Sequence, residues 1–243
     1  MQVCITYWYH SCFTLEIGGK VMLFDYPKRG MDSSIDDKIK ERIDDSELYV
    51  FISHAHGDHF SPEVTNFTED AERTHFMISS DVPVRGISNE VELSKSETLT
   101  SMEPDKVYQV ADLKVRTWKS NDAGIALLIH QNNKKIYYAG DLAKWNWPEW
   151  DEQKVKEHVR IFDDVVRELQ EEDIEIAFSN MDERLPSWAG PIDFMEKVEP
   201  SYFIPMHTFG NESWLNDLID SEIDAQSEIF HYEKPGDHLC CDI

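Results

Sequence analysis

The sequence predicts a layered α/β sandwich, and three features of the chain support this expectation. The first half consists mainly of short β-type runs separated by turns. The second half then alternates helical and strand-like segments. The chain has 243 residues, of which 41% are hydrophobic and 12% aromatic, which is enough for a buried core. This order of elements favours sheets covered by helices over one wound parallel sheet.

The strands are predicted by short apolar and β-branched runs bounded by turn residues. In chain order the runs are 3–9, 12–17, 20–26, 48–54, 74–79, 106–110, 113–118, 125–130, 135–140, 174–178, 201–206 and 227–232. The glycine pair at 18–19 and the QNNK stretch at 131–134 are hairpin signals. Helices are expected at 33–43, 62–67, 151–171, 190–198 and 212–220. With no repeat and no obvious linker, we expect a single domain over residues 1–243.

The charge of the chain narrows the class of partner. Its 48 acidic and 23 basic residues give a net charge of −25. Such a surface repels nucleic acids and anionic lipids, since phosphate binding needs clustered Lys and Arg. It does not exclude a small anionic substrate held by a metal, which brings its own local charge. We therefore expect a small-molecule substrate, no nucleic acid and no membrane partner, while unpaired sheet edges leave a homo-oligomer open.

The cysteines and the chain start bear on compartment. The spacing of the four cysteines fits neither a zinc knuckle nor a disulfide framework. The start, MQVCITYWYH, lacks the basic and apolar regions of a signal peptide. No apolar run approaches the roughly 18 residues of a transmembrane helix. These features predict a cytoplasmic protein.

The stretch SHAHGDH, residues 53–59, concentrates three histidines and an aspartate. Imidazole nitrogens and carboxylates bind borderline divalent metals such as zinc. His54 and His56 lie two residues apart at the end of an apolar run, so an extended backbone points both to one side. Gly57 then lets the chain turn sharply, and Asp58 and His59 face elsewhere. One turn can thus serve two metals; the alternative is a polar surface turn without a metal.

Three other apolar runs also end in candidate ligands. They end in His10, Asp141 and His207. Sites in α/β folds gather at the carboxyl ends of strands, so these side chains are expected near the first motif. Asp141 suits a bridging carboxylate and His207 an end ligand. Taken alone, Asp141 is also readable as a turn residue and His207 as a core or rim histidine.

These motifs, HAHGDH, AGD and PMH in that order, resemble the metallo-β-lactamase superfamily of hydrolases. The stretches YWYHSCFTLEIGGKVMLFDY and ISHAHGDHFSPEV resemble its ascorbate-6-phosphate lactonase-like branch, and the likeness covers nearly the whole chain. The resemblance implies an αββα four-layer sandwich with a dinuclear metal site between its two sheets. It implies metal ligation by His54, His56, Asp58, His59, Asp141 and His207.

One departure from the family pattern concerns the number of metals. The family usually supplies another histidine before the AGD aspartate, where this chain has Ser120, Asn121 and Asp122. Asp122 is a candidate substitute ligand, directly or through water, or only a turn residue before Gly124. We therefore expect one or two zinc ions, with Mn²⁺ or Fe²⁺ as alternatives that tolerate more oxygen ligands.

Several further residues are candidates for the surroundings of the metals. His10 either lines the site, bonds a substrate or joins the metal shell; the alternative is a buried histidine bonded to backbone. Asp25 is expected to orient a ligand histidine, and Asp182 to face the site. Wall candidates, which are otherwise packing residues, are Trp145, Trp147, Phe209 and Asn211.

These residues predict a metal-dependent hydrolase acting on a small lactone, ester or phosphodiester. The metals lower the pKa of a bound water and so supply a metal-bound hydroxide. Asp58 would accept a hydrogen bond from that water, and His10 would protonate the leaving group. The competing hypothesis is a non-catalytic or degenerate metal-binding or sensing protein of the same fold. A flavo-diiron redox protein would need a flavin domain, and none is visible in the sequence.

Overall fold

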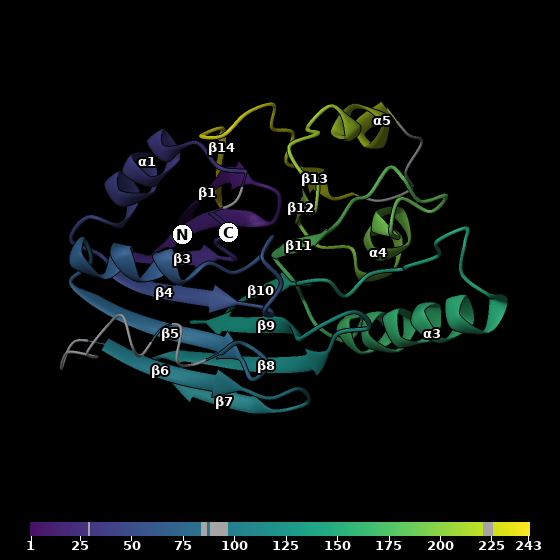
Figure 1. Ribbon diagram of the computed structural model, residues 1–243, viewed down its shortest axis with the longest axis horizontal. Helices are drawn as coiled ribbons and strands as arrows, with labels where there is room; N and C mark the ends of the chain where they lie inside the picture. The colour runs from purple at the N-terminus through teal and green to yellow at the C-terminus, as the bar shows by residue number, and fades with distance from the viewer. Residues whose placement is uncertain (29, 84–86, 88–96, 221–225) are drawn as a thin grey trace. The chain divides into compact units, whose positions relative to one another are not determined.

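The structure, a computed structural model, describes residues 1–28, 30–83, 87, 97–220 and 226–243. These form two compact units: Met1–Glu103 together with Tyr232–Ile243, and Pro104–His231. Within the described ranges each unit holds one seven-stranded mixed β-sheet and its own helices (Figure 1). The predicted α/β class is therefore confirmed, whereas one domain over 1–243 stays a prediction. No helix in the described ranges has the length and apolar character that a membrane span requires.

The first unit is built on a sheet with the order β14-β1-β2-β3-β4-β5-β6. Its strands are β1 (Gln2–Tyr9), β2 (Cys12–Ile17), β3 (Lys20–Phe24), β4 (Glu47–Ile52), β5 (Arg73–Ser79), β6 (Glu97–Met102) and β14 (His238–Asp242). Strands β3 to β6 run parallel, while β14, β1, β2 and β3 pair antiparallel. Parallel strands bring their carboxyl ends to one edge, which is where sites form.

Two helical segments of the first unit pack on this sheet. Helix α1 (Ser33–Ile43) begins at Asp32, whose side chain accepts a hydrogen bond from the Ser34 N–H. Its isoleucines at 35, 39 and 43 recur at helical spacing and pack on residues of β3 and β4 in one core cluster. The 3₁₀ segment η1 (Pro62–Glu69) adds Val64 and Phe67 to the same cluster.

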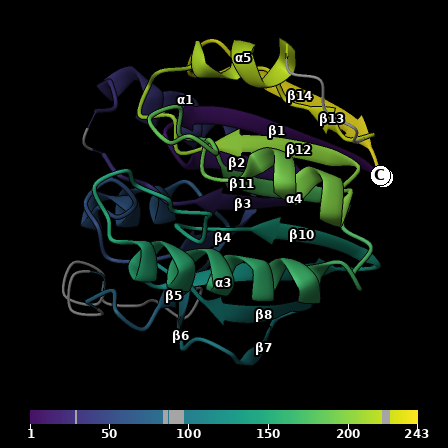
Figure 2. The same ribbon diagram turned by 90° about the vertical axis from the view of Figure 1, so that its right-hand side faces the viewer.

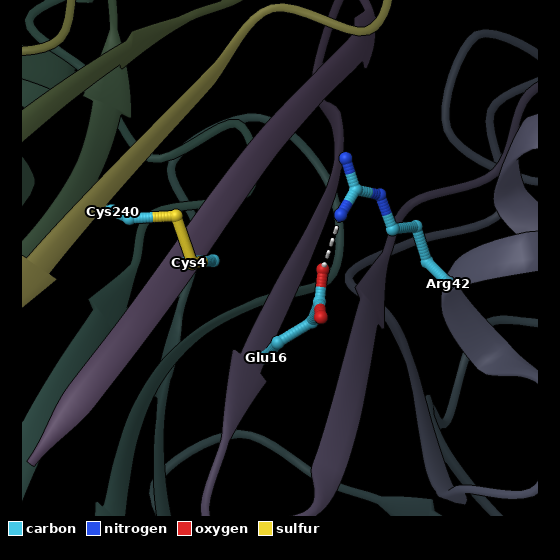
Figure 3. Close-up of a disulfide and its surroundings, with 4 residues drawn as sticks. All are labelled: Cys4, Glu16, Arg42 and Cys240. Carbon is cyan, nitrogen blue, oxygen red and sulfur yellow. Dashed lines mark ion pairs between the residues drawn. A yellow bond between two sulfur atoms is a disulfide. The ribbon is translucent and has the colours of Figure 1, made fainter.

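A disulfide joins the two ends of the chain, and it corrects our expectation for the cysteines. Cys4 on β1 and Cys240 on β14 are directly opposite in the antiparallel register, with Cα atoms 4.1 Å apart (Figure 3). Beside them, Arg42 of α1 pairs with Glu16 of β2 at 3.5 Å (Figure 3). The two cysteines are 236 residues apart, so only the strand pairing creates this bond, and spacing along the chain cannot reveal it.

The second unit is built on a sheet with the order β13-β12-β11-β10-β9-β8-β7. Its strands are β7 (Val107–Val110), β8 (Leu113–Lys119), β9 (Ile125–Gln131), β10 (Lys134–Tyr138), β11 (Ile176–Asn180), β12 (Tyr202–Met206) and β13 (Glu228–Ile229). Strands β7 to β10 form antiparallel pairs, and β10 to β13 run parallel. The three strands β10, β11 and β12 therefore end at a common edge.

Helices of the second unit lie along its sheet (Figure 2). Helix α3 (Glu152–Leu169) begins at Asp151, which accepts a hydrogen bond from the Lys154 N–H, and it buries Phe162 and Val166 on one face. Helix α4 (Pro191–Val198) follows Gly190, whose φ of 93° and close approach to the Lys144 side chain exclude a Cβ. Helix α5 (Trp214–Asp220) is short.

The predicted elements are largely confirmed, with four differences. Strands β6 and β14 were not predicted, because each is short and interrupted by polar residues. The predicted helix at 62–67 is a 3₁₀ segment. The strand at 227–232 shortens to two residues. Strand β3 also ends at Phe24, one residue before Asp25, and that early end matters for the site.

Candidate metal centre

In the first unit, three segments deliver polar side chains to one edge of the sheet. Strands β3 and β4 are parallel, and the Asp25 N–H continues their ladder by donating to the Phe51 carbonyl at 2.9 Å. Residues 53–59 follow directly after β4. Because β2 runs antiparallel to β3, the turn that joins β1 and β2 and carries His10 lies at the same end. The fold therefore gathers His10, Asp25 and the histidine motif.

The buried carboxylate of Asp25 organises this set. It accepts hydrogen bonds from the Ser53 N–H at 2.7 Å, from the Ser53 hydroxyl at 2.6 Å and from His59 Nδ1 at 2.7 Å. The Ser53 oxygen in turn lies 2.9 Å from His54 Nδ1. An ionised carboxylate only accepts, so His59 carries its proton on Nδ1, and the same logic places a proton on His54 Nδ1. Both rings are thereby set to use Nε2 as a metal donor.

The histidine rings of the first unit lie at ligand-to-ligand spacings. The Nε2 atoms of His10 and His59 are 3.2 Å apart, and the His54 ring centroid lies 4.1 Å from that of His59 and 4.6 Å from that of His56. Two nitrogens bound to one tetrahedral zinc at about 2.0–2.1 Å are separated by about 3.3 Å. Asp58 Oδ2 lies 3.8 Å from His10 Nε2. The fold thus brings His10 to the histidine motif, and its role there stays a prediction.

The turn within the motif differs from our expectation for Gly57. Gly57 has no left-handed φ, and a Cβ added there would meet nothing within 4 Å. The turn is made instead by helix-like backbone bonds, in which the N–H groups of His59 and Phe60 both donate to the His56 carbonyl, at 3.0 and 2.9 Å. The unusual backbone lies elsewhere, at His10 (φ 53°) and Asp25 (φ 38°). Such strained positions cluster at functional sites.

In the second unit, three candidate residues follow three adjacent parallel strands. Asp141 follows β10, Asp182 follows β11 and His207 follows β12. Their side chains meet: His207 Nε2 lies 3.9 Å from Asp141, and His207 Nδ1 lies 3.5 Å from Asp182. All three are buried, and His207 has a φ of 70°. The strand ends thus bring these three candidates together within the second unit, whereas their place near the first motif stays a prediction.

Asp182 is the electrostatic counterpart of Asp25. Burial raises its pKa, but hydrogen bonds from Arg184 and His207 outweigh burial and lower the pKa to about 2. Arg184 donates to both carboxylate oxygens, from Nε at 2.8 Å and from Nη2 at 2.5 Å. Nδ1 of His207 faces the Asp182 carboxylate at 3.5 Å, and Nε2 faces Asp141, so Nε2 is the atom turned toward a second candidate ligand. The same aspartate–histidine pairing therefore occurs once in each unit.

The loop after β10 is fixed by side chains that bond its backbone. Trp145 is buried, donates from Nε1 to the Asp141 carbonyl at 2.9 Å, and its ring centroid lies 5.2 Å from that of His207. Its role as a pocket wall stays a prediction. Asn180 donates to the carbonyls of Gly140 and Leu142. These bonds hold the Asp141 backbone in place without using its carboxylate.

Residues 120–122, where the family's extra histidine is missing, connect two other segments through hydrogen bonds of Asn121. Asn121 accepts a hydrogen bond from the Ala143 N–H and donates to the carbonyls of Ala143 and His158, which ties the loop after β10 to α3. The exposed Asp122 shares in none of the potential ligand clusters found among the described residues. Its predicted role as a substitute ligand therefore gains no support from this arrangement, and it remains untested.

The donor chemistry fits a divalent metal. Asp25, His54 and His59 each offer a ligand atom, and these atoms lie within 4.8 Å of one another. Because Asp25 already accepts three hydrogen bonds, we assign it to orient the imidazoles. Nitrogen donors with oriented tautomers and carboxylate neighbours are what zinc prefers, and Mn²⁺ or Fe²⁺ also accept such sets.

Two residues that matter here were not identified from the sequence. Ser53 stood inside the motif, but its bridging role depends on Asp25 arriving from another strand. Arg184 follows Asp182 by two residues in SNMDERLP, and a basic residue beside a strand-end aspartate was the only available signal.

A comparison with known proteins assigns the chain to a family. Residues 4–162 match the family described as "Beta-lactamase superfamily domain". Curated proteins gave no sequence match.

Solved structures with a similar fold share little sequence with the chain. Igni18, a metallo hydrolase from Ignicoccus hospitalis, has a TM-score of 0.66 and 16% identity over 100% of both chains. The metallo-β-lactamase fold protein YhfI from Bacillus subtilis has a TM-score of 0.63 and 12% identity over 99% of both chains. A possible metal-dependent hydrolase from Veillonella parvula has a TM-score of 0.60 and 13% identity, over 98% of this chain and 99% of its own. At these identities the structural likeness shows the fold alone. The family match over residues 4–162 shows that the chain belongs to the metallo-β-lactamase superfamily.

Proposed function

We propose that the protein is a metal-dependent hydrolase of a small lactone, ester or phosphodiester. One observation carries the proposal: in each unit a buried aspartate faces Nδ1 of a histidine, Asp25 with His59 at 2.7 Å and Asp182 with His207 at 3.5 Å. Such pairs raise the basicity of the other ring nitrogen and fix its direction toward a metal. Membership of a superfamily of mostly metal-dependent hydrolases supports the same function.

The residues that would hold metal are the histidines and carboxylates described above. They are His54, His56, Asp58, His59, Asp141 and His207, with His10 as a further donor at ligand spacing. When bound, a divalent ion would lower the pKa of a water and polarise the substrate oxygen that gains charge. Zinc is our first choice of metal, and Mn²⁺ and Fe²⁺ are the alternatives.

The side chains at the first unit's sheet edge would manage the protons. The Asp58 carboxylate is 41% exposed and can accept a proton or hydrogen bond from an attacking water. His10 Nε2, 3.8 Å from Asp58, is placed to return a proton to a leaving group unless it serves as a ligand. The pair thus supplies an acceptor and a donor.

The proposed substrate is a small molecule. The net charge of −25 opposes binding of nucleic acid. The resemblance of the N-terminal stretch to the ascorbate-6-phosphate lactonase-like branch favours lactones. A homo-oligomer and the branch assignment remain predictions.

A second candidate is a metal-binding protein without catalysis. The observation that favours it is Asn121, which stands near the expected extra histidine and is committed to three backbone hydrogen bonds. A protein with fewer donors would hold fewer ions or hold them weakly. Sensing or structural metal binding would then replace hydrolysis.

A loading and activity experiment separates the two. Protein stripped with a chelator is reloaded with Zn²⁺, Mn²⁺ or Fe²⁺ and assayed on a γ-lactone, a p-nitrophenyl ester and bis(p-nitrophenyl) phosphate. We expect one class of substrate to be hydrolysed and His59→Ala to lose that activity. The control His231→Ala, which changes an exposed histidine outside both donor sets, should keep it. Metal binding without turnover of any class would favour the second candidate.

A further inference from the structure

Arg184 lies beside His207 in surroundings that the proposed hydrolysis does not use. Its guanidinium carbon lies 5.2 Å from the centroid of the Trp147 ring and 5.0 Å from that of Phe209. Phe209 in turn meets the His207 ring edge to face at 4.7 Å. One cation and two aromatic faces thus adjoin the candidate ligand of the second unit.

The hydrogen bonds of Arg184 leave one edge of its guanidinium for a ligand. A guanidinium can bind carboxylates along two edges, one formed by Nε and one Nη, the other by both Nη atoms. Arg184 uses the first edge on Asp182. Among the described residues, no partner is found for Nη1, and the side chain is 50% exposed. Its second edge is therefore available to a group from solution.

The setting also holds this arginine still. The bidentate bond to Asp182 and the two aromatic faces restrict a side chain that otherwise loses considerable rotamer entropy on binding. The hydrogen bond to Asp182 raises the pKa of Arg184, so the group stays cationic. In a chain with 48 acidic and 23 basic residues, a fixed, half-exposed cation beside a candidate ligand is a local exception.

We propose that Arg184, Trp147 and Phe209 bind an anionic group, a carboxylate or a phosphate monoester, carried by an organic substrate whose reacting bond lies at His207. The anion would take the second guanidinium edge in a bidentate bond, and the aromatic rings would cover the adjoining carbon skeleton. The placement of the reacting bond rests on the proposed function, whereas the binding of the anion does not.

A purely structural arginine would behave differently. If Arg184 only neutralised Asp182 and so positioned His207, its loss would affect charged and neutral ligands alike. A binding role predicts an effect that depends on the ligand's charge. Matched ligands with and without the anion therefore distinguish the two roles.

The first test measures binding by calorimetry with metal-loaded protein. The probes are phenyl phosphate and benzoate, with phenol as the neutral counterpart. We expect Arg184→Gln to lower the affinity for both anions by about tenfold or more, as the loss of charge-assisted hydrogen bonds implies. The affinity for phenol should stay unchanged. Arg160→Gln is the matched control, since Arg160 carries the same charge on an exposed face of α3 and pairs with Asp164. Equal affinities in the Arg184 and Arg160 variants would overturn the proposal.

The second test uses turnover and keeps the two proposals distinguishable. On an ester hydrolysed by the wild type, Arg184→Gln should raise KM for the substrate that bears a carboxylate and spare its methyl ester. An equal fall in kcat for both would mean that Arg184 is a positioning residue only, and the anion site would be rejected. If no lactone, ester or phosphodiester is hydrolysed but the anions still bind through Arg184, the site stands and the proposed hydrolase function fails.

Discussion

Replacing Asp25 by asparagine should disable a metal donor while leaving the fold in place. Three donors converge on the Asp25 carboxylate: the N–H and the hydroxyl of Ser53, and Nδ1 of His59. An amide supplies one acceptor and two donors, so with its oxygen in the position of Oδ1 both contacts of Oδ2, to the Ser53 hydroxyl and to His59 Nδ1, become donor against donor. The Ser53 N–H cannot turn away, whereas a hydroxyl can rotate and an imidazole can change tautomer.

The favoured arrangement in Asp25→Asn therefore keeps the amide oxygen on the Ser53 N–H. Its NH₂ group then faces His59, which accepts by moving its proton from Nδ1 to Nε2. That tautomer removes Nε2 as a metal donor. Loss of such an orienting carboxylate costs about 10–100-fold in metal affinity, or about 1.4–2.7 kcal/mol. The remaining mismatch costs about 1–3 kcal/mol of folding stability.

Competition with a chromogenic chelator measures the metal affinity, and the ¹⁵N shifts of the His59 ring report its tautomer. Asp164→Asn is the control, because it makes the same charge change on an exposed face of α3. The reasoning is refuted if Asp25→Asn folds and binds metal within twofold of the wild type. It is also refuted if affinity falls while the His59 proton stays on Nδ1.

Three further predictions follow from other contacts. Asn121→His should lower the free energy of unfolding by about 2–4 kcal/mol, because three hydrogen bonds are lost, and add no bound metal; a gain of one metal equivalent would contradict this. Cys4→Ser should lower the free energy of unfolding in urea by about 2–5 kcal/mol, because it opens a loop closed over a 236-residue separation. Cys240→Ser and the wild type treated with a reductant should show the same decrease. Asp182 has a folded pKa of about 2, below its usual value of about 3.9, so its stabilisation is present above pH 4 and lost as the pH falls toward 2; Asp182→Asn should flatten acid unfolding of metal-free protein in that window.

Much of the site could be predicted because it depends on local pattern. Apolar runs that end in a histidine or aspartate predicted strand-end positions for Asp141 and His207, and the structure puts them after β10 and β12, two parallel strands on either side of β11. The dense histidine motif indicated metal binding by composition alone. The parallel ladder then explains why these ends converge.

The residues that were missed act through contacts that only the tertiary fold creates. Cys4 meets Cys240 because β14 returns to pair with β1, and the five-residue β14 is too short to carry a strand signal of its own. The sequence showed Asn121 only as a position near which the family's extra histidine is missing. In the structure its amide bonds two segments that are distant in the sequence. The role of Arg184 depends on its contacts with Asp182 and with the rings of Trp147 and Phe209, which lie far from it in the sequence.

The most direct test of the metal centre is the metal content of protein purified without a chelator. Elemental analysis would compare the wild type with His59→Ala, His207→Ala and the control His231→Ala. We predict at least one equivalent of a divalent transition metal in the wild type and the control, and a clear fall in both of the other variants. Wild-type protein without tightly bound metal, or variants with unchanged content, would contradict the assignment of these histidines as ligands.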